Sequence, residues 1–130
     1  MSALRPGDVE GAFVSLLAPA LGVPVSTRTP NPRPVSHVKV TRAGGNRWNL
    51  ILERPLLIVE CWAGTSVAAF DLAARAWQVL DGAEDSTVNG VTFGSMALAS
   101  PINMPDPDTT NPRYQFTAQP YARLLEGVTP

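Results

Sequence analysis

Cysteine and histidine are almost absent from this chain, because its 130 residues include only one of each. Cys61 therefore has no partner for an intramolecular disulfide, which is typical of a protein made in a reducing compartment. A usual structural zinc site takes four nitrogen or sulfur ligands, more than Cys61 and His37 together supply. We expect neither a disulfide framework nor a bound metal ion.

Charged side chains and long apolar runs are also scarce. Charged residues make up 16% of the chain, against about 25% in average soluble proteins. The net charge of -1 gives no general attraction to nucleic acid. The longest aliphatic run, residues 56–59, is far shorter than a membrane span, and the first residues lack the pattern of a signal peptide. We expect a soluble cytoplasmic protein without a membrane partner, part of whose surface other subunits cover.

Recognisable catalytic motifs are missing as well. The sequence has neither a glycine-rich dinucleotide-binding loop nor a P-loop. His37 falls on the polar side of an expected strand, and Cys61 falls inside an apolar one. Asp106 and Asp108, in "PDPD", lack the spacing of an EF-hand calcium loop. We predict that the protein is not an enzyme and has no catalytic, metal-binding or cofactor-binding residues, although a pocket with a perturbed Cys61 or His37 would favour an enzyme.

Proline, in contrast, is abundant, and the 13 prolines gather in two segments, 24–34 and 101–112. The first contains "PNPRP", with prolines at every second position, whereas a polyproline II ligand carries them at every third. Too few residues precede this segment to form a domain, so it is not an interdomain linker. The fixed φ angles predict a stiff connector between strands that holds Arg28 and Arg33 at fixed positions.

Hydrophobic periodicity predicts an α+β domain. The order α-β-β-β-α-β-β implies a mostly antiparallel sheet with two helices packed on it, in one domain over residues 1–130. Gly44 and Gly45 are expected to form a turn or flexible tip over 43–49. The expected elements are helices over about 7–19 and 64–80 and strands over 25–28, 37–42, 56–63, 88–99 and 113–121.

The second expected helix has a broader apolar surface than one core contact requires. Phe70 and Trp77 are seven residues apart and share a face roughly 100° from the centre of the core stripe. Either an adjacent loop of the same chain or a neighbouring subunit covers these two rings. The expected core stripe comprises Ala68, Ala69, Leu72, Ala73, Ala76, Val79 and Leu80.

Glu60 is the least expected residue of the most apolar strand. Its carboxylate either pairs with an arginine, within the fold or across an interface, or faces a solvent-filled channel.

A cluster of basic residues near an aromatic one leaves a small nucleic-acid-binding domain as a further alternative. Its members are Arg28, Arg33, Lys39, Arg42, Arg47 and Trp48.

The order of these segments resembles the tail terminator proteins of long-tailed bacteriophages, above all those of phages that infect actinobacteria. The likeness runs from Asp8 to about Arg123. It lies in "VSTRTPNPRPVSHVKVTRAGG", then "RPLLIVECWA", then an alanine-rich helix, then "NPRYQFTAQPYAR".

The resemblance implies an assembly protein of the virion neck, made in the host cytoplasm. Such proteins form a six-fold ring on the head-proximal end of the tail tube. The ring stops tube polymerisation and offers a docking surface to the head-side connector or closure protein, and DNA only passes through its channel. The alternative within this class is another neck protein, either a head-tail connector or a head-closure protein.

On this reading, subunits pack side by side through the second helix and the sheet edge, and two loops reach the neighbouring proteins. The candidate subunit contacts are Phe70, Trp77, Arg28, Arg33 and Glu60, and the candidate tube or connector contacts are Gly44, Gly45, Asn46, Arg47, Trp48, Met104, Asp106 and Asp108.

Overall fold

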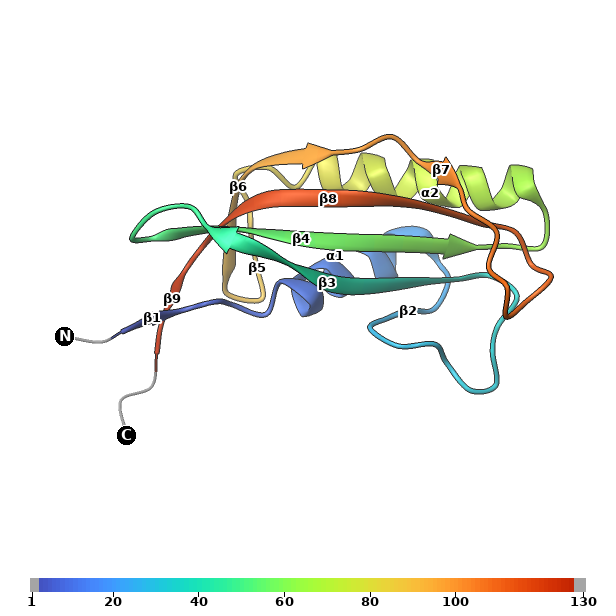
Figure 1. Ribbon diagram of the computed structural model, residues 1–130, viewed down its shortest axis with the longest axis horizontal. Coiled ribbons are helices and arrows are strands. Elements are labelled where there is room, and N and C mark those ends of the chain that lie inside the picture. The colour runs from blue at the N-terminus through green and yellow to red at the C-terminus, as the bar shows by residue number, and fades with distance from the viewer. Residues whose placement is uncertain (1–2, 128–130) are drawn as a thin grey trace.

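A computed structural model of the chain describes residues 3–127 as a curled, mostly antiparallel sheet with two helices on one of its faces (Figure 1). The expected α+β class is confirmed. The helices are α1 (Val9–Leu21) and α2 (Ser66–Asp81), and the strands are β1 (Leu4–Arg5), β2 (Val25–Ser26), β3 (His37–Arg47), β4 (Leu52–Trp62), β5 (Thr87–Val88), β6 (Val91–Leu98), β7 (Ile102–Asn103), β8 (Arg113–Arg123) and β9 (Leu125–Glu126).

The main sheet is built around β4 and β8. Its strand order is β2-β3-β4-β8-β6-β5, and β7 also pairs with β8. Among the pairings of residues 3–127, only that of β2 with β3 is parallel. The β3–β4 hairpin projects at one end of the sheet, and the small β1–β9 ribbon lies at the same end (Figure 1).

Alternation along the long strands produces the core. Leu57, Val59 and Cys61 of β4 are fully buried under the helices, whereas the residues between them are half-buried on the opposite face. Both helices begin at a capping side chain: Asp8 Oδ1 accepts from the amide of Gly11 at 2.9 Å, and Thr65 Oγ1 accepts from Ala68 at 3.1 Å.

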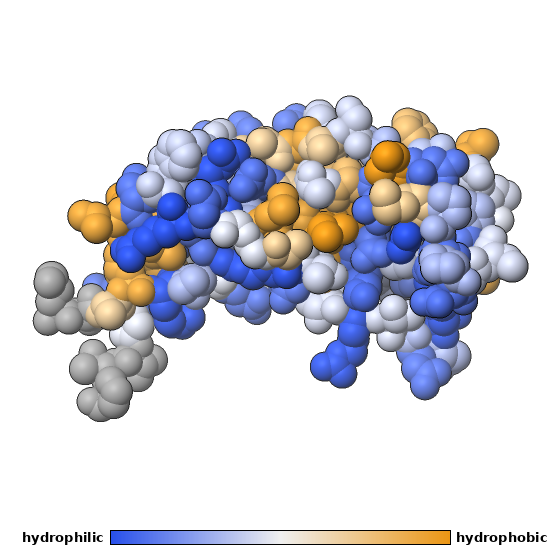
Figure 2. All heavy atoms as spheres, in the orientation of Figure 1, coloured by the Kyte–Doolittle hydropathy of each residue, from blue (hydrophilic) through white to orange (hydrophobic). Residues whose placement is uncertain are grey.

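The face of the sheet turned away from the helices is open to solvent, and we call it the open face. Leu56, Ile58 and Glu60 of β4 point to it. Figure 2 views this side of the molecule, and apolar atoms gather near its middle among polar ones. One face of the sheet is therefore covered by the helices, and the other face is accessible to a partner.

The expected Gly-Gly tip is wrong, because β3 continues through it to Arg47. Gly44 and Gly45 have φ angles of 99° and 107° and form an irregularity in the strand, where the register with β4 shifts between Arg42 and Gly45. A Cβ atom at Gly45 would overlap the backbone carbonyl of Arg54. The glycines thus serve a bulge, and the turn itself lies at 48–51.

The expected surface position of His37 is also wrong. Its side chain is fully buried, and its ring stacks on that of Trp62 with centroids 4.4 Å apart and planes at 7°. The two residues are register partners at the ends of β3 and β4. The polar-looking position is therefore covered, because residues 27–36, which we call the proline arm, fold back over it: Pro34 O lies 3.1 Å from His37 Nδ1.

Several element boundaries differ from the sequence-based expectation. Helix α1 runs past Pro19 and ends at Gly22, which has a φ of 67°. In α2, Ala68 is exposed and Val79 is only half-buried, whereas the rest of the expected stripe is buried. The strands expected over 25–28, 56–63, 88–99 and 113–121 are observed as 25–26, 52–62, 91–98 and 113–123, and the short strands β1, β5, β7 and β9 were not expected as separate elements.

Candidate functional site

The two proline-rich segments meet at one end of the sheet, and the carboxylate of Asp106 joins them. Asp106 Oδ2 accepts from Arg33 Nη2 at 2.7 Å and from Trp62 Nε1 at 3.0 Å, and Oδ1 accepts from the amide of Asp108 at 2.9 Å. Only 8% of the Asp106 side chain is exposed. One carboxylate thus fixes the proline arm, the end of β4 and the segment 101–112 to one another; we call this group the Asp106 clamp.

The clamp changes the acidity of its members. The amide of Asp108, followed by the Arg33 and Trp62 donors, lowers the pKa of Asp106 to about 2. Burial, together with the nearby Arg33 guanidinium, lowers the pKa of His37 below its usual value. At neutral pH the ionised Asp106 of the clamp therefore lies near a neutral His37.

Glu60, the one charged residue in the expected apolar strand, forms an ion pair with an arginine of the same chain. Its Oε2 lies 2.8 Å from Arg113 Nη1, and Arg113 Nε donates to Met104 O at 2.8 Å. The Arg113 guanidinium also lies 5.7 Å from the Trp62 ring centre, and that of Arg33 lies 5.0 Å from it. Arg113, which the sequence analysis did not single out, therefore fixes a second point of the segment 101–112.

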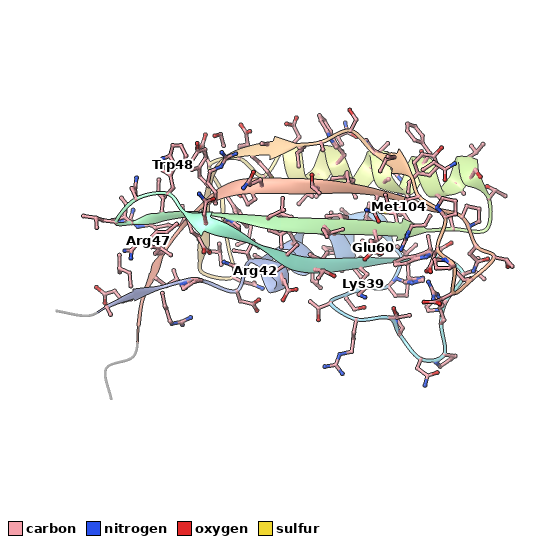
Figure 3. All side chains as sticks on the ribbon, viewed as in Figure 1. Lys39, Arg42, Arg47, Trp48, Glu60 and Met104 are labelled. Carbon is pink, nitrogen blue, oxygen red and sulfur yellow. The ribbon has the colours of Figure 1, made fainter. Side chains whose placement is uncertain are left out.

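Apart from Phe70 and Trp77 on α2, the predicted contact residues form two groups at opposite ends of β3 and β4. Figure 3 shows Glu60 and Met104 near one end and Arg47 and Trp48 near the other, with Lys39 and Arg42 along β3 between them. At the arm end, Arg33, Glu60 and Asp106 are engaged in intramolecular ion pairs, whereas Arg28, Met104 and Asp108 are exposed.

At the other end, the turn of the β3–β4 hairpin exposes apolar side chains. Trp48 is 53% exposed, Leu50 79% and Ile51 48%. Arg47 donates to the carbonyls of Asn49 and Leu50 at 2.9 and 2.8 Å. Arg47 therefore holds the turn in shape, and the exposed apolar side chains are the groups offered to a partner.

Behind this turn, Trp48 lies together with Tyr121 and Arg54 on the open face, and the sequence analysis missed the last two. The rings of Trp48 and Tyr121 meet edge to face at 5.2 Å. The guanidinium of Arg54 lies 4.8 Å from the Tyr121 ring centre and 5.7 Å from that of Trp48. The register between β4 and β8 creates this group, and single-strand alternation does not reveal it.

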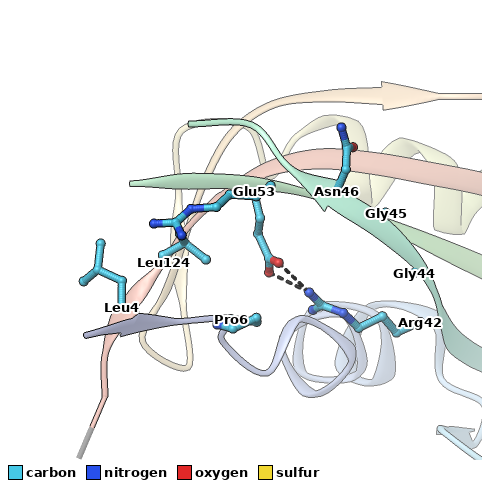
Figure 4. A pocket seen from close by; sticks show the side chains of 9 residues that line it. Leu4, Pro6, Arg42, Gly44, Gly45, Asn46, Glu53 and Leu124 are labelled. Atoms are coloured by element: carbon cyan, nitrogen blue, oxygen red, sulfur yellow. Dashed lines mark hydrogen bonds and ion pairs between the residues drawn. The ribbon is translucent and has the colours of Figure 1, made fainter. Parts of the chain in front are cut away.

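A cavity of about 350 Å³ lies between the hairpin and the β1–β9 ribbon (Figure 4). Both Glu53 carboxylate oxygens lie 2.7 Å from Arg42 Nη2, and Arg42 Nη1 also donates to Gly7 O at 3.4 Å. The Arg42 and Glu53 charges at this site are thus already paired, and we assign it no ligand. Gly44, Gly45 and Asn46, predicted as tube or connector contacts, line this cavity with Leu4, Pro6, Arg42, Arg47, Glu53 and Leu124.

The aromatic face predicted on α2 is only partly covered within the chain. Trp77 is half-buried against the core, whereas Phe70 is 47% exposed and meets Tyr114 edge to face at 5.4 Å. Val67, one turn before Phe70, is 81% exposed. The first half of α2 therefore keeps a small apolar surface next to β8.

Cys61 lacks the setting of an activated thiol. Burial, followed by the Glu60 charge, raises the pKa of Cys61 to about 12. Within residues 3–127, no three His, Cys, Asp or Glu side chains are grouped so as to hold a metal ion. Neither described helix is long and apolar enough to cross a bilayer. What the described residues do offer is shaped surface: a clamped end, an apolar hairpin turn and an open sheet face.

No protein-family model matches the sequence. No curated protein matches it at a significant level.

Proposed function

We propose that this chain is the subunit of a ring that ends the tail tube of a long-tailed bacteriophage, a tail terminator. The order of its segments, which resembles that family, supports the proposal. The structural observation that carries it is the Asp106 clamp. Arg33 and Asp106 are 73 positions apart, yet one carboxylate joins the two proline-rich segments into one surface.

A terminator has to offer a surface of fixed shape, because a surface that adapts to the next tube subunit would let the tube continue. Prolines restrict the backbone of both segments, and the clamp anchors each of them to β4. Little conformational entropy is then lost when a partner docks. The clamped end suits a docking platform better than a mobile loop would.

The two ends of the sheet differ in chemistry, as a ring between two different partners requires. The hairpin end exposes Trp48, Leu50 and Ile51. The arm end exposes charged side chains such as Arg28 and Asp108 and several prolines, together with the apolar side chains of Val35, Ile102 and Met104. In the proposal, one end meets the last ring of the tube and the other meets the head-side connector or closure protein.

On β3 and on β6, beyond their short pairings with β2 and β5, one backbone amide is bound by a carboxylate. Glu10 Oε2 accepts from the amide of Arg42 on β3 at 2.7 Å, and Glu84 Oε1 accepts from the amide of Met96 on β6 at 2.9 Å. A carboxylate on an outward amide removes a donor that a new strand would need. In the proposal, subunits of the ring therefore join through side chains, and not by pairing a strand at these two positions.

An assembly experiment with purified proteins tests the proposal. Tail tube protein from the same phage is polymerised alone and with this chain, and tube lengths are measured by negative-stain electron microscopy. We expect shorter tubes with a ring at one end only. Tubes of unchanged length without such rings would count against the proposal, and a D106A variant shows whether the clamp contributes.

A further inference from the structure

Arg54 is a cation without a counter-ion. Its Nε atom is buried and has no hydrogen-bond partner, and no carboxylate among residues 3–127 lies within 4.0 Å of its guanidinium. The rings of Trp48 and Tyr121 flank it on the open face. Removing a charge from water without a partner is costly, so this site favours the arrival of an anion.

A second free cation lies beside it. Glu53 pairs with Ala122, and Leu52 with Arg123, so Arg54, Tyr121 and Arg123 share the open face. Arg123 is exposed and forms no ion pair within the described part of the chain. We call Trp48, Arg54, Tyr121 and Arg123 the Arg54 patch; it contains two cations and no carboxylate.

The matching anions lie at the end of α2. Residues 81–85, "DGAED", form what we call the acidic segment, and its three carboxylate residues are exposed. Glu84 caps the β6 edge, whereas the side chains of Asp81 and Asp85 make no hydrogen bond or ion pair within residues 3–127. These two carboxylates remain available to a partner.

The two surfaces do not meet within one chain. The acidic segment borders β6, where Glu84 binds the amide of Met96, whereas Arg54 lies on β4, and β8 runs between these strands. Two strand spacings amount to about 10 Å, so the carboxylates pair with Arg54 only by coming from another copy.

We infer that the Arg54 patch of one subunit binds the acidic segment of the next subunit. This contact rests on the proposed ring and says which surfaces close it. It joins two different patches, which is the head-to-tail type of contact that builds rings. The planar guanidinium of Arg54 suits a carboxylate held in two hydrogen bonds, and the flanking rings exclude water from the pair.

Charge reversal tests the contact. Self-association of the full chain is followed by sedimentation velocity over a concentration series for the wild type, R54E, D81R/D85R and the combined triple variant. We expect each charge reversal to weaken association about tenfold or more, and the triple variant to regain most of it. R123E gives a second route should R54E unfold, and thermal melts show which variants are folded.

Arg5→Glu is the matched control, because Arg5 is an exposed arginine on β1, outside the patch and outside the predicted contact residues. Its reversal is expected to leave association within about twofold of the wild type. Wild-type protein that stays monomeric throughout the series, equal effects of R54E and R5E, or a triple variant no better than either parent would each overturn the inference. The inference would also be overturned if the Arg54 patch bound a single-stranded oligonucleotide through Arg54 while D81R/D85R self-associated like the wild type.

These outcomes are separate from those of the proposed function. If the chain shortens the tubes while R54E self-associates like the wild type, the inference is overturned and the terminator role is left intact. A chain that forms rings through the Arg54 patch but leaves tube length unchanged overturns the terminator role alone.

Discussion

Arg33 Nη2 and Asp106 Oδ2 lie 2.7 Å apart although 73 positions separate the two residues along the chain. The same carboxylate oxygen accepts from the indole of Trp62. This arrangement turns two proline-rich segments that look like independent loops into one anchored surface. These contacts imply a rigid surface and a constrained fold around it.

Removing the carboxylate is expected to destabilise the fold. In D106A the Arg33 guanidinium and the Trp62 N–H lose their partner in a largely buried site, and we expect a loss of about 2 kcal/mol in the free energy of unfolding, because the partial exposure of Arg33 softens the cost. Asp108→Ala, two residues away with an exposed side chain, should cost less than about 0.5 kcal/mol. Urea denaturation of the pair checks this, and equal losses would contradict the clamp.

Stability is expected to fall as the pH drops below the usual pKa of histidine. The pKa of buried His37 is lowered from 6.5, so below that value the unfolded chain binds a proton that the native state does not, and the difference in stability grows until the native pKa is passed. In H37F this loss of stability below about pH 6.5 should disappear. The depressed pKa of Asp106 acts only below about pH 4, where its usual value lies. An H37F profile identical to the wild type would refute the assignment.

The bulge in β3 predicts unequal effects of two neighbouring glycine substitutions. Gly44 and Gly45 both have positive φ angles, but a Cβ at Gly44 meets open space, whereas one at Gly45 overlaps the Arg54 carbonyl. We expect about 1–2 kcal/mol of destabilisation from G44A, the cost of the backbone conformation alone. G45A should cost about 3 kcal/mol or more. Melting temperatures of the two variants decide the matter, and a G45A variant as stable as G44A would contradict this geometry.

Cys61 is expected to be unreactive in the folded protein. Its thiol is fully buried and its pKa is raised to about 12, so almost no thiolate exists at neutral pH. A thiol reagent such as iodoacetamide should label it only in denaturant, as mass spectrometry can follow. Rapid labelling of the native chain would show that β4 opens or that the site is accessible.

Periodicity along the chain was enough to predict the long elements. The alternation in β3 and β8, the apolar run in β4 and the stripe on α2 are local signals, because buried residues fall at regular intervals or in short runs along such elements. The α+β class followed from their order. The same reasoning failed at His37, because a polar residue in an alternating strand looks exposed until another segment, here the proline arm, covers it.

The pairings between distant segments were beyond sequence reasoning. Glu60 was recognised as unusual, but its partner Arg113 depends on the register of β4 with β8. The sequence predicts a turn at the Gly-Gly pair although the pair forms a bulge, because glycine serves turns and bulges equally well. Sequence reasoning does not single out Arg54 and Tyr121, because each is ordinary in its own strand. Only their juxtaposition across the sheet is unusual.

The length of the tail is the most direct test of the terminator proposal. Particles from a phage lacking this gene are imaged by electron microscopy, with and without the gene supplied in trans. The account predicts overlong tails of variable length, unattached to heads, and restored length on complementation. Tails of normal length beside unjoined heads would contradict it and would assign the chain to a connector or closure role.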